Sequence, residues 1–162
     1  MSVRFQITGL DNYVKEWRAS KENDIIDALD YVGKHLVVEA RDNGDYHDRT
    51  NNLRSSIGFI VVQDGNIVRE NFEISSIGYE GGGEEGMASA QSFALELASE
   101  YNNGIVLIVM AGMNYTAYVE NGHYYKVNGE VRKSRPYNVL SSAEILASEL
   151  VPKILRDLKL IK

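Results

Sequence analysis

The strongest constraint on the fold is a set of apolar residues in the first quarter of the chain that recur every three or four positions. These residues are Ile25, Leu29, Val32, Leu36 and Ala40. That spacing places them on one face of an α-helix, so the stretch from about Lys21 to Arg41 predicts a long helix with one buried side. Asn43-Gly44 is a typical stop signal, because a glycine after the last turn readily adopts the left-handed conformation. The buried side needs a partner surface from the rest of the chain.

Strand-length segments in the middle of the chain predict that partner surface. Arg54–Gln63 and Asn66–Ile74 are rich in β-branched and aromatic residues, and Asp64-Gly65 between them favours a hairpin turn. The nearly continuous apolar run Ile105–Met110 predicts a central strand that is covered on both faces. Tyr115–Glu120 predicts a further strand. We therefore expect a mostly antiparallel sheet.

The remaining segments predict an opening strand and three more helices. Val3–Thr8 alternates Val3, Phe5 and Ile7 with polar neighbours, which is the pattern of a strand with one buried face. A short helix is predicted over Leu10–Trp17. Apolar stripes predict a helix over Met87–Tyr101 and a last helix over about Val139–Leu158, which Pro152 is expected to kink. The two stripes comprise Ala90, Phe93, Ala94, Leu97 and Tyr101, and then Leu140, Ala143, Leu146, Ala147, Leu150, Ile154 and Leu158.

Composition sets limits on the class of protein. The chain has 162 residues, with 44% hydrophobic and 25% charged residues, which fits one folded domain over residues 1–162. The sequence thus predicts a single α+β domain with a long N-terminal helix, a middle helix and a C-terminal helix on the sheet. It has no cysteine, so neither disulfides nor thiolate chemistry can contribute. We expect a cytosolic product without a secretory signal or a membrane-spanning segment.

Charge and motif patterns give little support for catalysis or for cofactor binding. The formal net charge of −6 argues against strong nonspecific binding to nucleic acid. Gly81, Gly83 and Gly86 have the spacing of a dinucleotide-binding loop, but Glu84 and Glu85 would oppose a pyrophosphate there, so the biased segment Gly78–Gly86 is interpreted as a flexible loop. No cofactor is predicted.

The histidines do not complete a recognisable site in the sequence. Asp45, His47 and Asp48 form the only cluster that resembles metal ligands, and we interpret them as loop residues satisfied by water and backbone. His35 and His123 have no partner that the sequence reveals. No metal site and no catalytic residue are therefore predicted.

Tyrosines are concentrated in one part of the chain. Of ten tyrosines, Tyr115, Tyr118, Tyr124 and Tyr125 fall within one short segment. Large amphipathic rings suit contacts between subunits, and they equally suit cross-strand packing within one subunit. Both interpretations stay open at this point.

Three features in order resemble a known family. They are the segment Thr50-Asn-Asn-Leu-Arg-Ser-Ser-Ile57, the segment Tyr115-Thr-Ala-Tyr-Val-Glu-Asn-Gly122, and an amphipathic helix at the carboxyl end. Together they resemble the tail-completion, or head-to-tail joining, proteins of long-tailed bacteriophages and prophages. The likeness extends from about Ile25 onward, and the glycine loop with the helix after it resembles an insertion.

The resemblance implies a structural role without catalysis. It implies a subunit that forms a ring of identical copies at the virion neck, between the portal-adaptor complex and the tail tube, after synthesis in the host cytoplasm. DNA would pass through without specific binding. The expected contact residues, from the two motifs, are Leu53, Arg54, Ile57, Tyr115, Tyr118 and Glu120. The hairpin Leu53–Phe72 is expected to pair edge to edge with a neighbour, and Arg54 is expected to form a buried salt bridge with Glu120.

A second hypothesis comes from a different class of protein. The chain could be a small cytosolic enzyme or ligand-binding domain whose Gly81–Gly86 loop closes over a site containing His47 or His123. Binding of a nucleotide or a metal ion would distinguish this hypothesis, because a ligand of the native state raises the melting temperature.

Overall fold

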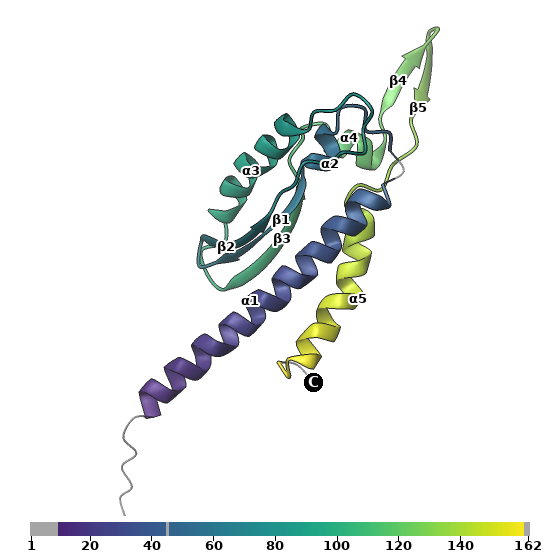
Figure 1. Ribbon diagram of the computed structural model, residues 1–162. Coiled ribbons are helices and arrows are strands. Elements are labelled where there is room, and N and C mark those ends of the chain that lie inside the picture. The colour runs from purple at the N-terminus through teal and green to yellow at the C-terminus, as the bar shows by residue number, and fades with distance from the viewer. Residues whose placement is uncertain (1–9, 45, 161–162) are drawn as a thin grey trace, which may run out of the picture.

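The computed structural model describes residues 10–44 and 46–160 of the chain (Figure 1). Its elements in order are α1 (Leu10–Asp42), α2 (Asn52–Ser55), β1 (Ile57–Gln63), β2 (Asn66–Asn71), α3 (Glu84–Ala98), β3 (Ile105–Ala111), α4 (Thr116–Asn121), β4 (Tyr124–Val127), β5 (Glu130–Lys133) and α5 (Ser141–Asp157). The predicted α+β class, with antiparallel sheets and a long N-terminal helix, is confirmed. The predicted strand Val3–Thr8 lies outside the described residues.

The larger sheet has the strand order β2-β1-β3, and both pairings are antiparallel. The β1–β2 hairpin is confirmed, and Asp64 and Gly65 form its turn with positive φ values of 50° and 81°. The prediction that Ile105–Met110 is the central strand is wrong, because β1 lies in the centre and β3 at an edge. The apolar run in β3 arises because one face packs beside α1 and the other, with Ile108 and Met110, packs with α3, not because strands flank it on both sides.

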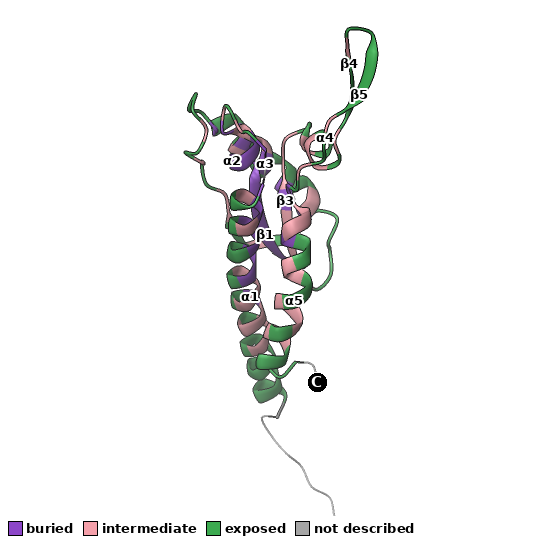
Figure 2. Cartoon of the chain, turned by 90° about the vertical axis from the view of Figure 1, so that its right-hand side faces the viewer, coloured by how far each residue is buried: buried purple, intermediate pink, exposed green. Residues whose placement is uncertain are grey.

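Strand β1 is buried on both faces. Its odd residues Ile57, Phe59 and Val61 pack with α1, and its even residues Ile60 and Val62 pack with α3. Figure 1 shows the two helices on opposite faces of the sheet, and Figure 2 shows the buried residues gathered along β1 and the adjoining side of α1. This three-layer arrangement gives the chain its main hydrophobic core.

Helix α1 runs continuously over 33 residues, whereas the sequence analysis predicted two helices. No glycine or proline separates Leu10–Trp17 from Lys21–Arg41, and Lys21 pairs with Asp24 at 2.9 Å one turn further along. The first turns extend beyond the sheet and α5 in Figure 1, and all side chains of residues 11–20 are exposed.

Helix α3 begins and ends three residues before its predicted limits. The buried residues of α3 are Gly86, Ala90, Ala94 and Ala98, while Phe93, which the predicted stripe included, is 37% exposed. The helix approaches the sheet so closely that a Cβ atom on Gly112, just after β3, would collide with the backbone of Ala90. Only small side chains fit at that distance.

The segment Tyr115–Glu120, predicted to be a strand, contains most of helix α4. The backbone N–H of Val119 donates to the carbonyl oxygen of Tyr115 at 3.2 Å, which is a helical bond. The strand prediction for this segment is therefore wrong, and the short helix brings Glu120 to the start of α5.

The last part of the chain forms a hairpin and a helix. Strands β4 and β5 pair through the Asn128-Gly129 turn and project from the body of the molecule (Figure 1). Helix α5 packs along α1 and contains Pro152, and its start lies two residues after the predicted one.

We expect Gly33→Ala to destabilise the fold although alanine favours helices. A Cβ atom at Gly33 would lie 2.5 Å from Cδ2 of the fully buried Phe59 ring. A glycine in a helix interior ordinarily costs about 1 kcal/mol relative to alanine, but an overpacked core costs about 1–3 kcal/mol. Urea titration should therefore show a net loss of up to about 2 kcal/mol in the free energy of unfolding.

The exposed Val38 on the same helix provides the control. Val38→Ala should change the free energy of unfolding by less than about 0.5 kcal/mol. A gain in stability for Gly33→Ala would show that α1 does not press against Phe59.

Candidate functional site

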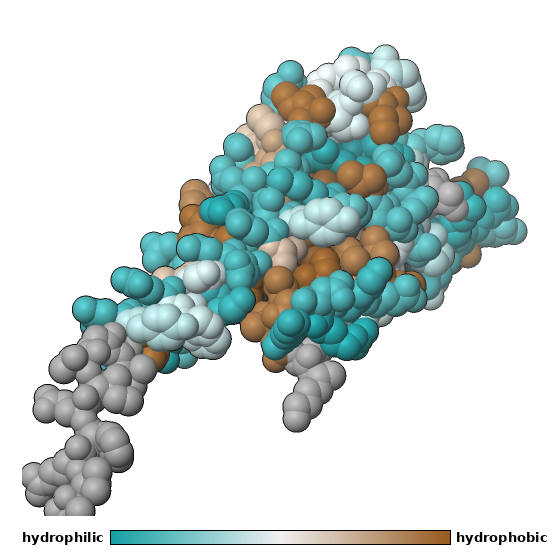
Figure 3. Space-filling model, turned by 60° about the horizontal axis from the view of Figure 1, so that its bottom comes forward, coloured by the Kyte–Doolittle hydropathy of each residue, from teal (hydrophilic) through white to brown (hydrophobic). Residues whose placement is uncertain are grey.

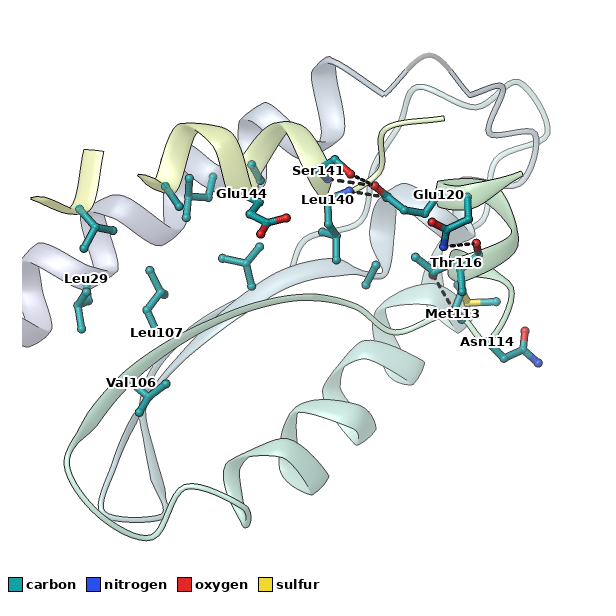
Figure 4. Close-up of a pocket in the computed structure, with 18 of the residues that line it drawn as sticks. Leu29, Val106, Leu107, Met113, Asn114, Thr116, Glu120, Leu140, Ser141 and Glu144 are labelled. Carbon is teal, nitrogen blue, oxygen red and sulfur yellow. Dashed lines mark hydrogen bonds between the residues drawn. The ribbon is translucent and has the colours of Figure 1, made fainter. Parts of the chain in front are cut away.

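A large apolar groove lies between β3 and α5 in the described part of the chain. It has a volume of about 910 Å³, with α1 behind it and α4 at one end. The residues that line it include Leu29 and Leu36 of α1, Leu107 and Val109 of β3, and Ala143 and Ala147 of α5. Figure 4 shows side chains of α1, β3 and α5 converging on this space, which we call the β3–α5 groove.

The groove lies where a fourth strand would extend the sheet. Within the described residues β3 pairs only with β1, so its other edge has no strand partner. Strand β3 contains no charged residue, no proline and no glycine. Uncharged, regular edge strands readily pair with another chain, because their backbone N–H and C=O groups form a ready template.

The opposite edge of the sheet is protected. Strand β2 carries Arg69 and Glu70, and its register with β1 shifts between Val61 and Val62. Charged side chains and bulges both discourage pairing between sheet edges. This contrast indicates β3, and not the predicted hairpin edge at β2, as the edge open to a partner.

Glu120 at the end of α4 holds the start of α5. Its carboxylate accepts hydrogen bonds from the backbone N–H groups of Val139, Leu140 and Ser141 at 2.7, 2.8 and 3.2 Å, and also from the Ser141 hydroxyl. A carboxylate here satisfies amides at the helix N-terminus and complements the helix dipole. The contact sets the position of α5, and therefore one wall of the groove (Figure 4).

The environment of Glu120 favours its charged form. Partial burial pushes its pKa upward, but the hydrogen bonds from the Ser141 side chain and the three amides outweigh burial and hold the pKa below its usual value. Because the folded-state pKa is lowered, the carboxylate stabilises the fold above its unfolded pKa. That contribution is lost as the pH falls through the folded-state value.

The predicted salt bridge between Arg54 and Glu120 is wrong within the chain. The Arg54 guanidinium instead donates to the carbonyl oxygens of Gly44 and Tyr46 at 3.1 and 3.2 Å, and it lies 4.5 Å from the centre of the Tyr46 ring. Arg54 therefore fixes the chain after α1, while Glu120 fixes α5. Both residues determine local structure, but at separate places.

Glu120 is half-buried, and the other five predicted contact residues divide into two groups by exposure. Leu53, Arg54 and Ile57 are buried inside the chain, with no more than 7% of each exposed. Tyr115 is at the surface, and Tyr118 is 63% exposed. In this conformation the first group supports the interior of the subunit, and only the tyrosines present a surface to a neighbour.

The projecting hairpin carries aromatic and basic side chains. Tyr124 is 72% exposed, and Lys133 lies 5.6 Å from the centre of its ring. The His123 ring contacts Tyr118 and Tyr125, with ring centres 6.2 and 5.9 Å apart. We call the segment from His123 to Tyr137 the basic arm. Exposed tyrosines beside cations are typical of protein contact surfaces.

The glycine loop and the histidines do not form a common site. Gly81 and Gly83 adopt positive φ values of 73° and 108°, while Gly86 is already inside α3. His47 lines a separate hollow of about 220 Å³ that includes no residue of the glycine loop. In the described part of the chain, no three acidic, histidine or cysteine side chains are grouped to hold a metal ion.

Comparisons of the chain with models of known protein families, with curated proteins and with solved structures found no match. Among the described residues, no helix combines the length and the apolar character that crossing a bilayer requires. The surface itself is therefore the basis for a functional proposal. Figure 3 shows apolar side chains gathered in the middle of one face of the molecule, bordered by polar ones.

The sequence predicts α1, β3 and α5 around the groove, but it predicts a strand in place of α4 and does not reveal the groove. The apolar stripe of the last helix was visible, yet it does not show which part packs on α1 and which part remains open. The useful signal was the uncharged run Ile105–Met110, which is unusual for an edge strand.

We expect Glu120→Ala to loosen α5 and to change the pH dependence of stability. Loss of a helix-capping side chain costs about 0.5–2 kcal/mol, so the free energy of unfolding at pH 7 should fall by about 1–2 kcal/mol. The loss should shrink as the pH falls through the lowered folded-state pKa of Glu120, since the wild-type carboxylate becomes protonated there. Urea titrations across this pH range measure both effects.

Glu149→Ala, an exposed position on α5, is the matched control. It should leave both the stability and its pH dependence near those of the wild type. Equal effects at the two positions would contradict a capping role for Glu120.

Proposed function

We propose that this chain is a structural, noncatalytic subunit that assembles with copies of itself. We further propose that it acts at the neck of a long-tailed bacteriophage, joining the portal-adaptor complex to the tail tube. The observation that carries the proposal is the unpaired, uncharged edge of β3 beside an apolar groove. A stable subunit with such an edge is suited to pairing with another chain.

The charge distribution supports contacts between different faces of identical subunits. The basic arm carries a net +3 from four cations and one carboxylate, so the other residues of the chain carry a net −9. Opposite charges on different surfaces favour head-to-tail docking, which closes into a ring when the rotation between copies allows it. The acidic remainder of the surface would let DNA pass without strong binding.

The two segments that carry the family resemblance lie together in the structure. Thr50 and Leu53 from the first segment line the same small hollow as Tyr115 and Val119 from the second. Their spatial proximity supports the proposal, because two motifs that are distant in sequence form one local unit. The neck position follows from the resemblance alone.

The alternative of a small enzyme or ligand-binding domain stays a hypothesis. The glycine loop packs on α2, where a Cβ atom on Gly86 would collide with the backbone of Asn52. This contact makes the start of α3 part of the folded body. A thermal-shift assay with nucleotides and divalent metal ions tests the alternative, and a rise in melting temperature that is lost in His47→Ala or His123→Ala would favour it.

We expect the double variant Tyr118→Ala and Tyr124→Ala to weaken self-assembly without weakening the fold. Both rings are mainly exposed, so their removal should leave the melting temperature nearly unchanged. Interface tyrosines often contribute more than 1 kcal/mol each, so the dissociation constant should rise at least about tenfold. Native mass measurement over a concentration series provides the readout.

Tyr79→Ala removes a tyrosine that is 79% exposed in the glycine loop and is not part of the basic arm, and it serves as the control. It should assemble like the wild type. A wild-type chain that stays monomeric at every concentration, alone and with its neck partners, would contradict the proposed function.

A further inference from the structure

We propose that the β3–α5 groove is filled by the amino-terminal segment Val3–Thr8 of a second copy, which pairs as a strand with the free edge of β3. This inference rests on the proposed self-assembly and specifies how one contact is made. The inserted segment comes from a second copy of the same amino-acid sequence. It lies outside the described residues. Three features of the segment support this pairing: its side-chain pattern, its length and the distance that it can reach.

The side-chain pattern of the segment matches a groove with one apolar wall. Val3, Phe5 and Ile7 alternate with polar residues, so a strand would direct them to one face. The side of β3 that carries Leu107 and Val109 borders the groove, and α5 covers the position beside it. The three apolar side chains would therefore face α5, and the polar ones would face the opposite side of the sheet.

The length of the segment matches the edge that it would cover. A strand rises about 3.3 Å per residue, so Val3–Thr8 would extend about 20 Å, close to the length of β3. Strand β3 presents seven residues, Ile105–Ala111. The uncharged edge and the apolar wall run along the same strand, so one extended segment can use both.

The segment cannot fill the groove of its own chain. Gln63 bonds to Glu22 of α1 at 3.4 Å and pairs with Ile105, so the start of β3 lies level with Glu22. Leu10 lies about 18 Å further along the helix axis, at about 1.5 Å per residue. The two residues from Thr8 to Leu10 span at most about 7 Å. Thr8 therefore cannot reach its own β3, whereas a neighbouring copy can deliver it.

The projecting start of α1 suits delivery to a neighbour. Residues 11–20 stand clear of the sheet and of α5, and they carry the exposed Tyr13, Val14 and Trp17 (Figure 1). A helix that extends outward can reach a neighbouring copy, so it suits delivery of the residues that precede it in the sequence. Insertion of such an arm into the next copy makes a contact between two different surfaces, as ring formation requires.

Cysteine crosslinking tests the arrangement directly, because the chain has no native cysteine. Copies carrying Val3→Cys, Phe5→Cys or Ile7→Cys are mixed with differently tagged copies carrying Ala147→Cys, and disulfides are detected by mass. We expect at least one of the three to crosslink between copies. Arg4→Cys and Gln6→Cys on the other face, and Ser148→Cys on the exposed side of α5, serve as controls and should crosslink at least about tenfold less.

A charge-matched pair of full-length variants tests how much the apolar side chains of the segment contribute to the free energy of self-assembly. Phe5→Glu with Ile7→Glu should raise the dissociation constant of self-assembly at least about tenfold, and Gln6→Glu with Thr8→Glu should leave it nearly unchanged. A synthetic peptide of residues 2–9 should bind the Phe5→Glu, Ile7→Glu chain. The same peptide with both glutamates should bind at least about tenfold more weakly.

The outcomes separate this inference from the proposed function. Assembly that persists in the Phe5→Glu, Ile7→Glu variant, without crosslinks to Ala147→Cys, overturns the inference and leaves self-assembly standing. Crosslinks that form with equal yield from both faces of the segment also overturn it. If the wild-type chain never assembles and the peptide also fails to bind, both the inference and the proposed function are overturned.

Discussion

The structure depends on the burial of β1 between two helices. Ile57, Phe59 and Val61 face α1, while Ile60 and Val62 face α3, so one strand of seven residues connects both halves of the core. Gly33 lets α1 approach Phe59, and small residues let α3 approach the other face. A strand buried in this way fixes the register of β2 and β3, because a shift by one residue would exchange its two faces.

This arrangement leaves the two edges of the sheet unequal. Strand β2 carries charged side chains and a register shift, while β3 remains uncharged beside the groove. Glu120 then positions α5 so that it lies along α1 and leaves space beside β3. A hydrophobic edge next to an apolar hollow lowers the solubility of a free subunit. The same surface stabilises an assembly when another chain covers it.

The sequence predicted those elements whose signals are local. The periodicity of Ile25 to Ala40, the Asp64-Gly65 turn and the stripe of the last helix each reflect interactions within a few residues, and each prediction held. The predicted strand order was wrong, because an apolar run such as Ile105–Met110 has the same pattern in the middle of a sheet as at an edge beside a groove. The strand prediction for Tyr115–Glu120 was wrong because six residues are too few to distinguish a helical from a strand period. The buried places of Leu53 and Arg54, and the groove itself, depend on long-range packing that no local pattern encodes.

Hydrogen exchange of the backbone amides of β3 tests directly whether the free edge of this strand is covered when copies assemble. The full-length chain is compared at low concentration, as free subunits, and at high concentration, as assemblies. If β3 pairs with another copy, amides within Ile105–Ala111 should gain protection on assembly, while those of the charged strand β2 should change little. Protection that appears along Asn66–Asn71 and leaves Ile105–Ala111 unchanged would contradict this pairing.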